Sequence, residues 1–105
     1  MDRLNRTIVS LGGILLLLIL AAYPFIFMPS GEAVFREQRC ITCHRFRGNG
    51  GMAAPDLTGV ATQRGTIWIM RQIRDPKSHN PDSRMPSYKH LGCLELYAII
   101  DYLKG

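Results

Sequence analysis

The sequence predicts an all-α chain, with one membrane-spanning helix within residues 1–30 and a small helical domain over residues 31–105. Two observations predict this fold class. A long N-terminal stretch has no charged residue, and later segments carry apolar residues at helical spacing, with no alternating strand pattern. A domain of about 75 residues has a small core relative to its surface, so it usually needs additional stabilisation from a metal, a disulfide or a buried cofactor.

The N-terminal stretch is long enough to cross a bilayer. No charge occurs from Thr7 to Met28, and 14–20 is an unbroken run of isoleucine and leucine. A signal peptide is the alternative, because Arg3 and Arg6 precede the apolar stretch and Ala21-Ala22 follow the isoleucine and leucine run. The apolar stretch continues past these alanines without an Ala-x-Ala site, which favours an uncleaved anchor. The connection 29–31 reaches only about 10 Å, so we expect the domain to stay at the membrane.

The domain is predicted to contain three helical segments separated by loops. The first begins at Glu32 and leads into Cys40, with a glycine-rich loop following at 48–51 and irregular chain at 53–64. The second helix begins with Thr66 as its cap and ends at Asp75, before a loop at 76–91 with three prolines. Its expected buried positions are Ile67, Met70 and Ile73. The last helix opens at Gly92 or Cys93, and its apolar stripe comprises Leu96, Ile99, Ile100 and Leu103.

The net charge of the chain is +5, and the residues before the apolar stretch supply only +1 of it. The remaining +4 favours an acidic partner or an anionic membrane surface, although a solvated basic face is the more ordinary explanation. The basic segment 45–51 has one aromatic residue and no second aromatic motif around it, so nucleic acid is not expected as a partner.

The chemistry of the chain is concentrated at Cys40-Ile41-Thr42-Cys43-His44. Two cysteines at i and i+3 on a helical turn can bond two vinyl groups of one porphyrin, and the next histidine then lies beneath the iron. A thioredoxin-like pair would need a βαβ context, which the sequence lacks. A zinc site could be completed only by His90 and Cys93, at unlike spacing. The motif therefore predicts one covalently attached haem c, with His44 as an iron ligand.

Met85 is the favoured second iron ligand. It lies in the proline-bounded loop at 83–88, and Pro86 stiffens the backbone that would present its thioether. Four other residues are weighed against it. Met70 is more typical of a helix core and Met52 lies too near the attachment motif. His79 and His90 remain as alternatives.

Residues 31–105 resemble a class I c-type cytochrome of the short, membrane-bound kind. The segments that carry the resemblance are Gly31 to Phe35 before Cys-x-x-Cys-His, 54–59, Trp68 with 73–76, 84–86, and 102–103. They resemble cytochrome c subunits of membrane oxidoreductase complexes. Cys93 departs from the family pattern, in which an acidic or hydroxyl residue is more usual, and we expect it to be a small buried hydrophobe.

The resemblance implies several site contacts. Pro55 is expected to offer its carbonyl to the ring of His44, which would orient this ligand. The first and last helices are expected to cross, with Gly31 and Phe35 on one side and Tyr102 and Leu103 on the other. Three further residues, each equally compatible with an ordinary surface role, could donate to the haem propionates: Arg64, Trp68 and Tyr88.

The expected function is outer-sphere electron transfer, because two axial ligands leave the iron no open position for a substrate. The short connection favours a fixed subunit of a respiratory or photosynthetic complex in the membrane, with a redox donor and an acceptor as partners, over an enzyme in its own right. The resemblance implies a haem domain on the periplasmic side of a bacterial cytoplasmic membrane. The alternatives are a gas sensor or peroxidase in which Met85 dissociates, and a haem-bearing assembly subunit.

Overall fold

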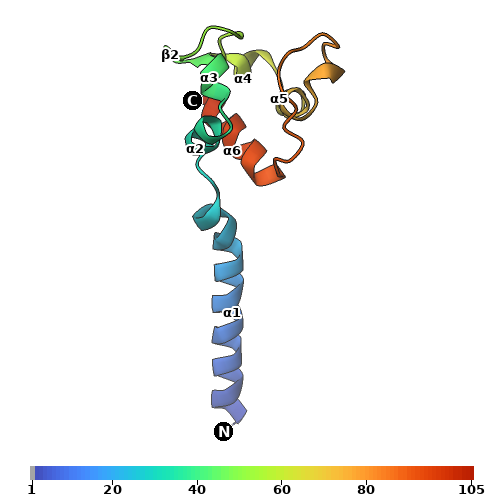
Figure 1. The fold of residues 1–105 in the computed structure, drawn as a ribbon. Coiled ribbons are helices and arrows are strands. Elements are labelled where there is room, and N and C mark those ends of the chain that lie inside the picture. Colours follow the sequence, from blue (N-terminus) through green and yellow to red (C-terminus); the bar gives the residue numbers. More distant parts are fainter. Residues whose placement is uncertain (1) are drawn as a thin grey trace.

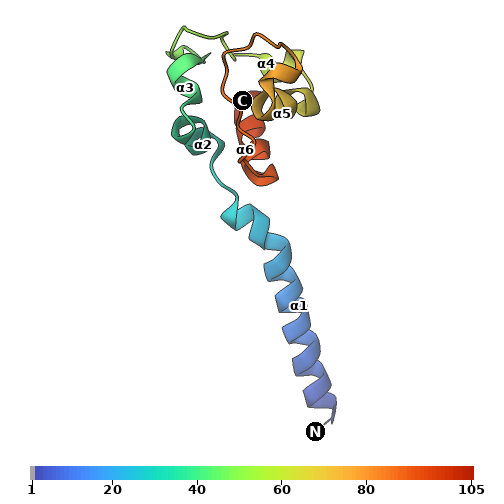
Figure 2. The ribbon, with the colours of Figure 1, turned by 45° about the vertical axis from the view of Figure 1, so that its right-hand side comes forward.

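The computed structural model describes residues 2–105, and its first helix projects from the rest of the chain (Figures 1 and 2). This helix, α1, spans Asp2–Phe27, and no residue of it is buried. Its 26 residues correspond to about 39 Å of helix, more than the roughly 30 Å hydrocarbon thickness of a bilayer. By length and composition α1 is a candidate membrane span. Because α1 ends at Phe27 and α2 begins at Gly31, only residues 28–30 connect them.

The remaining elements form a small helical domain. In chain order they are α2 (Gly31–Glu37), α3 (Cys40–Cys43), β1 (Arg45–Phe46), β2 (Asn49–Gly50), α4 (Val60–Gln63), α5 (Thr66–Arg74), the 3₁₀ helix η1 (Pro76–Ser78) and α6 (Cys93–Lys104). The all-α prediction is confirmed apart from one two-residue antiparallel pair, in which Arg45 faces Gly50. Two short helices, α4 and η1, lie in stretches expected to be irregular. Each is a single turn, too short to leave a periodic pattern.

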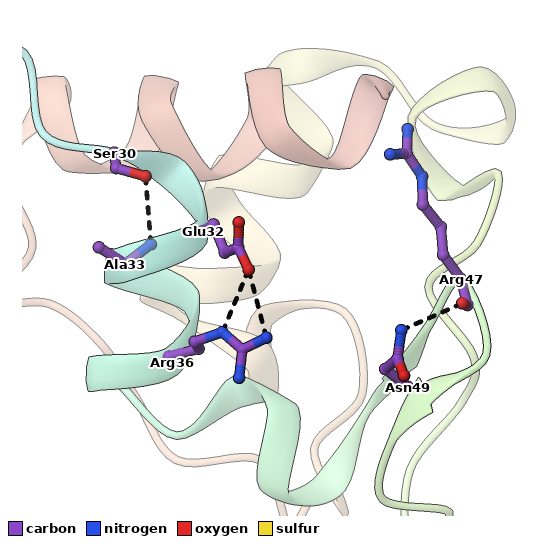
Figure 3. A network of polar contacts seen from close by, with 6 residues as sticks. All are labelled: Ser30, Glu32, Ala33, Arg36, Arg47 and Asn49. Carbon is purple, nitrogen blue, oxygen red and sulfur yellow. Dashed lines mark hydrogen bonds and ion pairs between the residues drawn. The ribbon is translucent and has the colours of Figure 1, made fainter.

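The start of α2 is fixed by local hydrogen bonds (Figure 3). Ser30 caps the helix by accepting from the Ala33 amide at 3.4 Å. Glu32 and Arg36, one helical turn apart, form an ion pair at 3.2 Å on the exposed face. Exposed pairs of this kind contribute little, so the position of α2 depends on the face that it buries.

The core lies where α2 crosses α6. Phe35 of α2 packs on Tyr102 of α6 with ring centroids 5.5 Å apart, and Phe46 lies 5.0 Å from the same ring. At the crossing point the backbones are in close contact: a Cβ on Gly31 would overlap the Ala98 carbonyl oxygen and lie 2.6 Å from Tyr102 Cβ. The predicted crossing is therefore present, and only glycine fits position 31 without displacement.

The apolar stripe predicted for α6 is confirmed, because Leu96, Ile99, Ile100 and Leu103 are all buried. The face predicted for α5 is partly wrong. Ile67 is 71% exposed, whereas Ile69 and Ile73 are buried. Residues six apart lie about 120° apart around a helix and residues four apart about 40°, so Ile69 and not Ile67 shares the face of Ile73. Met70 is half-buried against the core.

Candidate functional site

The two cysteines of the motif lie on the single turn α3, and His44 follows at its end. The His44 amide donates to the Cys40 carbonyl at 2.9 Å, which completes the turn. Cys40 is half-buried against the core, while Cys43 is exposed. Burial is the largest effect on the Cys40 thiol and raises its pKa, so this thiol is protonated near neutral pH. One cysteine therefore faces the interior and the other lies at the surface.

The chain after β2 packs closely against this turn. The Gly51 amide donates to the Ile41 carbonyl at 2.9 Å, and the Ala54 amide donates to the Cys43 carbonyl at 3.0 Å. A Cβ on Gly51 would overlap the Thr42 carbonyl oxygen. The sequence indicated only a glycine-rich loop here. The structure gives Gly51 a specific part, which is to let the backbone pass against the attachment turn.

The imidazole of His44 is oriented by a backbone carbonyl. Its Nδ1 lies 2.8 Å from the Pro55 carbonyl oxygen, which can only accept, so Nδ1 carries the proton and Nε2 keeps a free lone pair. The next turn is closed by the Asp56 carboxylate, which accepts from the Thr58 amide at 2.8 Å. This hydrogen bonding lowers the pKa of Asp56. The segment that presents Pro55 is thus held in place by its own side chains.

Met85 is presented by a loop that is tied to the end of α5. The Tyr88 amide donates to the Ile73 carbonyl at 3.0 Å, and the Ser87 hydroxyl donates to the Arg74 carbonyl at 2.6 Å. The Met85 side chain itself is half-buried and packs against the core. The loop is therefore anchored within three residues of its thioether.

Gln72, which sequence reasoning did not assign to the site, lies beside Met85, and His79, an alternative ligand from the sequence, pairs with Gln72. Gln72 of α5 donates through Nε2 to Met85 Sδ at 3.6 Å, and its Oε1 lies 2.8 Å from His79 Nδ1. The His79 ring stacks on Trp68 with centroids 4.3 Å apart and planes at 4°. The available signal was spacing: Gln72 follows Trp68 by four residues, so both lie on one face of α5.

The three residues considered for the haem propionates have other contacts in the structure. The Arg64 guanidinium lies over the Trp68 ring at 4.3 Å. The Tyr88 hydroxyl donates to the Gln38 carbonyl at 3.0 Å, two residues before Cys40. Burial, and to a lesser extent the neighbouring Cys40 and Cys43, raise the pKa of Tyr88. A role toward the propionates stays a prediction for all three.

Cys93 corrects one prediction, because it is exposed at the first position of α6 and not buried. The face of α6 that packs on α2 and the core begins at Leu96, so the first residue of the helix lies outside it. His90 pairs through Nε2 with Gln38 Oε1 at 3.0 Å. Within residues 2–105 no three His, Cys, Asp or Glu side chains gather as a metal site.

The donor set and its surroundings fit a covalently held haem. Two thiols, an imidazole with a free Nε2 and a thioether are the groups that attach and ligate this cofactor. Half-buried apolar side chains continue from the core to the attachment turn and the Met85 loop: Ile41, Leu57, Val60, Ala61, Trp68, Met70 and Tyr88. They would supply the apolar surroundings that a porphyrin needs.

The profile of the cytochrome c family matches residues 29–105. The chain belongs to the cytochrome c family. Members of this family bind covalently attached haem c, and its iron makes them electron-transfer proteins that require redox partners. A cytochrome c oxidase subunit 2 from Alkalihalophilus pseudofirmus is 30% identical over 83 residues, which cover 71% of this chain. The chain spans about a quarter of the length of that relative, 24%.

Proposed function

We propose that this cytochrome c domain is an electron carrier whose single haem is attached through Cys40 and Cys43 and ligated by His44 and Met85. When bound, haem c supplies an iron that accepts and releases one electron. The chain orients His44 through Pro55 and holds Met85 through its anchored loop. With both axial positions filled, no site is left for a substrate, which favours outer-sphere transfer over catalysis.

The observation that carries this proposal is the contact between His44 Nδ1 and the Pro55 carbonyl at 2.8 Å. It fixes the tautomer in which Nε2 can bind iron, and an orienting contact of this kind also raises the basicity of a ligand. Met85 is favoured over the two remaining histidines because each of those has another partner. His79 pairs with Gln72, and His90 pairs with Gln38.

The rival function is a gas sensor or peroxidase, in which Met85 would leave the iron. Binding of carbon monoxide to the reduced full-length protein at neutral pH separates the two. The electron carrier predicts slow and weak binding, because the thioether must first be displaced. Fast and complete binding in the unmodified protein would contradict the proposal and favour the sensor. A Met85→Ala variant serves as the positive control, since it opens the sixth position.

We also propose that residues 1–30 anchor the chain and that residues 31–105 form the haem domain on the extracytoplasmic side of a bacterial cytoplasmic membrane. The support is α1, which is long and apolar enough to span, and the three-residue connection to α2. Four Cα–Cα intervals separate Phe27 from Gly31, so at about 3.5 Å per interval the connection holds the domain within about 14 Å of the end of α1. A protease added to sealed cells or spheroplasts tests the sidedness.

The short connection further supports a fixed place in a membrane electron-transfer complex, over a shuttle that would need a longer reach. The similarity to an oxidase subunit favours the same view. Extraction of native membranes in mild detergent, followed by affinity purification of the tagged chain, should recover further subunits. Haem that is reduced and reoxidised during turnover would then distinguish a working carrier from an assembly subunit. A monomeric haem protein after gentle extraction would contradict the complex.

A further inference from the structure

We propose that Gln72 is a positioning residue for the Met85 thioether and that His79 acts through Gln72. The inference rests on the proposed function, because it takes Met85 as the sixth ligand of the iron. It goes beyond that function by assigning the control of this ligand to two side chains on α5 and beside η1. Neither of them belongs to the Cys-x-x-Cys-His motif.

The geometry defines what each group of the Gln72 amide does. Its Nε2 lies 3.6 Å from Met85 Sδ, and its Oε1 lies 2.8 Å from His79 Nδ1. Only the NH₂ group can donate to sulfur, and a carbonyl oxygen in its place would face the sulfur lone pairs. The reverse orientation of the amide would therefore lose the contact with Met85. The contact with Met85 therefore favours the orientation in which Nε2 faces the sulfur, and His79 is compatible with it.

His79 supports that orientation in one of its tautomers. When Gln72 Nε2 faces Met85, Gln72 Oε1 accepts from His79 Nδ1, which carries the proton in this contact. The His79 ring is itself held flat against Trp68, with centroids 4.3 Å apart. Trp68 in turn lies beneath the Arg64 guanidinium. The stack thus fixes the imidazole, the imidazole supports the amide, and the amide meets the thioether.

The contact with Gln72 restricts the orientation of the Met85 sulfur. A methionine side chain turns about three bonds, so its sulfur needs an external contact to keep one orientation. The Gln72 N–H occupies one of the two sulfur lone pairs and leaves the other for the iron. Without it the thioether gains rotational freedom and an outside ligand displaces it more readily. Loss of one hydrogen bond predicts an increase in the binding constant of such a ligand of about two- to tenfold.

The experiment uses the haem-loaded full chain in detergent and two readouts. One is the binding constant of imidazole to the oxidised protein, and the other is the methionine-to-iron charge-transfer band. Gln72→Met keeps the side-chain length but removes the N–H. Gln72→Glu also lacks the amide N–H and keeps an acceptor for His79. If Gln72→Met fails to fold or to hold haem, the two readouts of Gln72→Glu decide the test. The matched control is Gln38→Met, which breaks the other glutamine–histidine contact of the domain.

The expected result is a two- to tenfold rise in imidazole binding and a changed band in both Gln72 variants, with Gln38→Met unchanged. His79→Phe keeps the stack on Trp68 and should shift both readouts in the same direction, adding little to Gln72→Met. If Gln72→Met matches the unmodified protein while Met85→Leu loses the band, the inference is wrong and Met85 remains the ligand. If Met85→Leu keeps the band, the proposed ligand is wrong and the inference is overturned with it.

Discussion

Gly31 is a position at which a single methyl group should clearly destabilise the domain, because α2 and α6 are in backbone contact there. A Cβ there would overlap the Ala98 carbonyl oxygen and lie 2.6 Å from Tyr102 Cβ, against an ordinary contact of about 3.4 Å or more. Gly31→Ala must therefore separate α2 from α6 by about 1 Å or more. Overpacking of this kind typically costs about 1–3 kcal/mol. For a domain of this size the melting temperature should fall by roughly 4–8 °C per kcal/mol.

The assay is thermal unfolding of the haem-loaded chain, followed by circular dichroism of the haem bands so that α1 does not contribute. Gly65→Ala is the matched control, because a Cβ at Gly65 meets no atom within 4 Å. We expect that variant to change the melting temperature by no more than a few degrees. Equal melting temperatures for Gly31→Ala and the unmodified protein would refute the close crossing of α2 and α6, since alanine otherwise favours a helix by about 0.5–1 kcal/mol.

Three further predictions concern the surroundings of the site. Tyr88→Phe leaves the half-buried Gln38 carbonyl without its partner and should lower the free energy of unfolding by about 1–2 kcal/mol in denaturant titration; no change would contradict the contact. The lowered pKa of Asp56 means that its carboxylate stabilises the turn above the ordinary aspartate pKa and that this contribution is lost as pH falls through the lower folded value. An NMR titration of the Asp56 carboxyl carbon checks this, and a midpoint at the ordinary value would contradict it. Cys93→Ser should change stability by less than about 0.5 kcal/mol while preventing disulfide-linked dimers on non-reducing gels; a large loss would mean that Cys93 is buried.

The parts of the fold that could be predicted from sequence are those with a repeating physical pattern. An uncharged stretch of bilayer length predicts a membrane-spanning helix, and apolar residues at helical spacing predict the buried face of α6. The face of α5 was misassigned because Ile67, Met70 and Ile73 recur every three residues, a spacing that drifts around a helix. The neighbouring Ile69 is the residue that packs with Ile73.

The site also contains features that could be predicted from sequence and features that could not. Cys40, Cys43 and His44 could be predicted because attachment to one porphyrin requires that local spacing. The contacts of Gln72 could not, because they join residues from a helix and a loop that are adjacent only after folding. The exposure of Cys93 likewise depends on where α6 begins relative to its packing face, and a cysteine gives no indication of that by itself.

The pairing of His44 with Met85 is most directly tested by the midpoint potential of the haem in a Met85→His variant. Thioether ligation favours the ferrous state relative to a second imidazole, and axial ligands span roughly 0.8 V in all. We predict a fall of about 100 mV or more, with Met52→His as the control, since Met52 is 81% exposed. A potential unchanged in Met85→His, or an equal fall in both variants, would contradict the assignment of Met85 as the iron ligand.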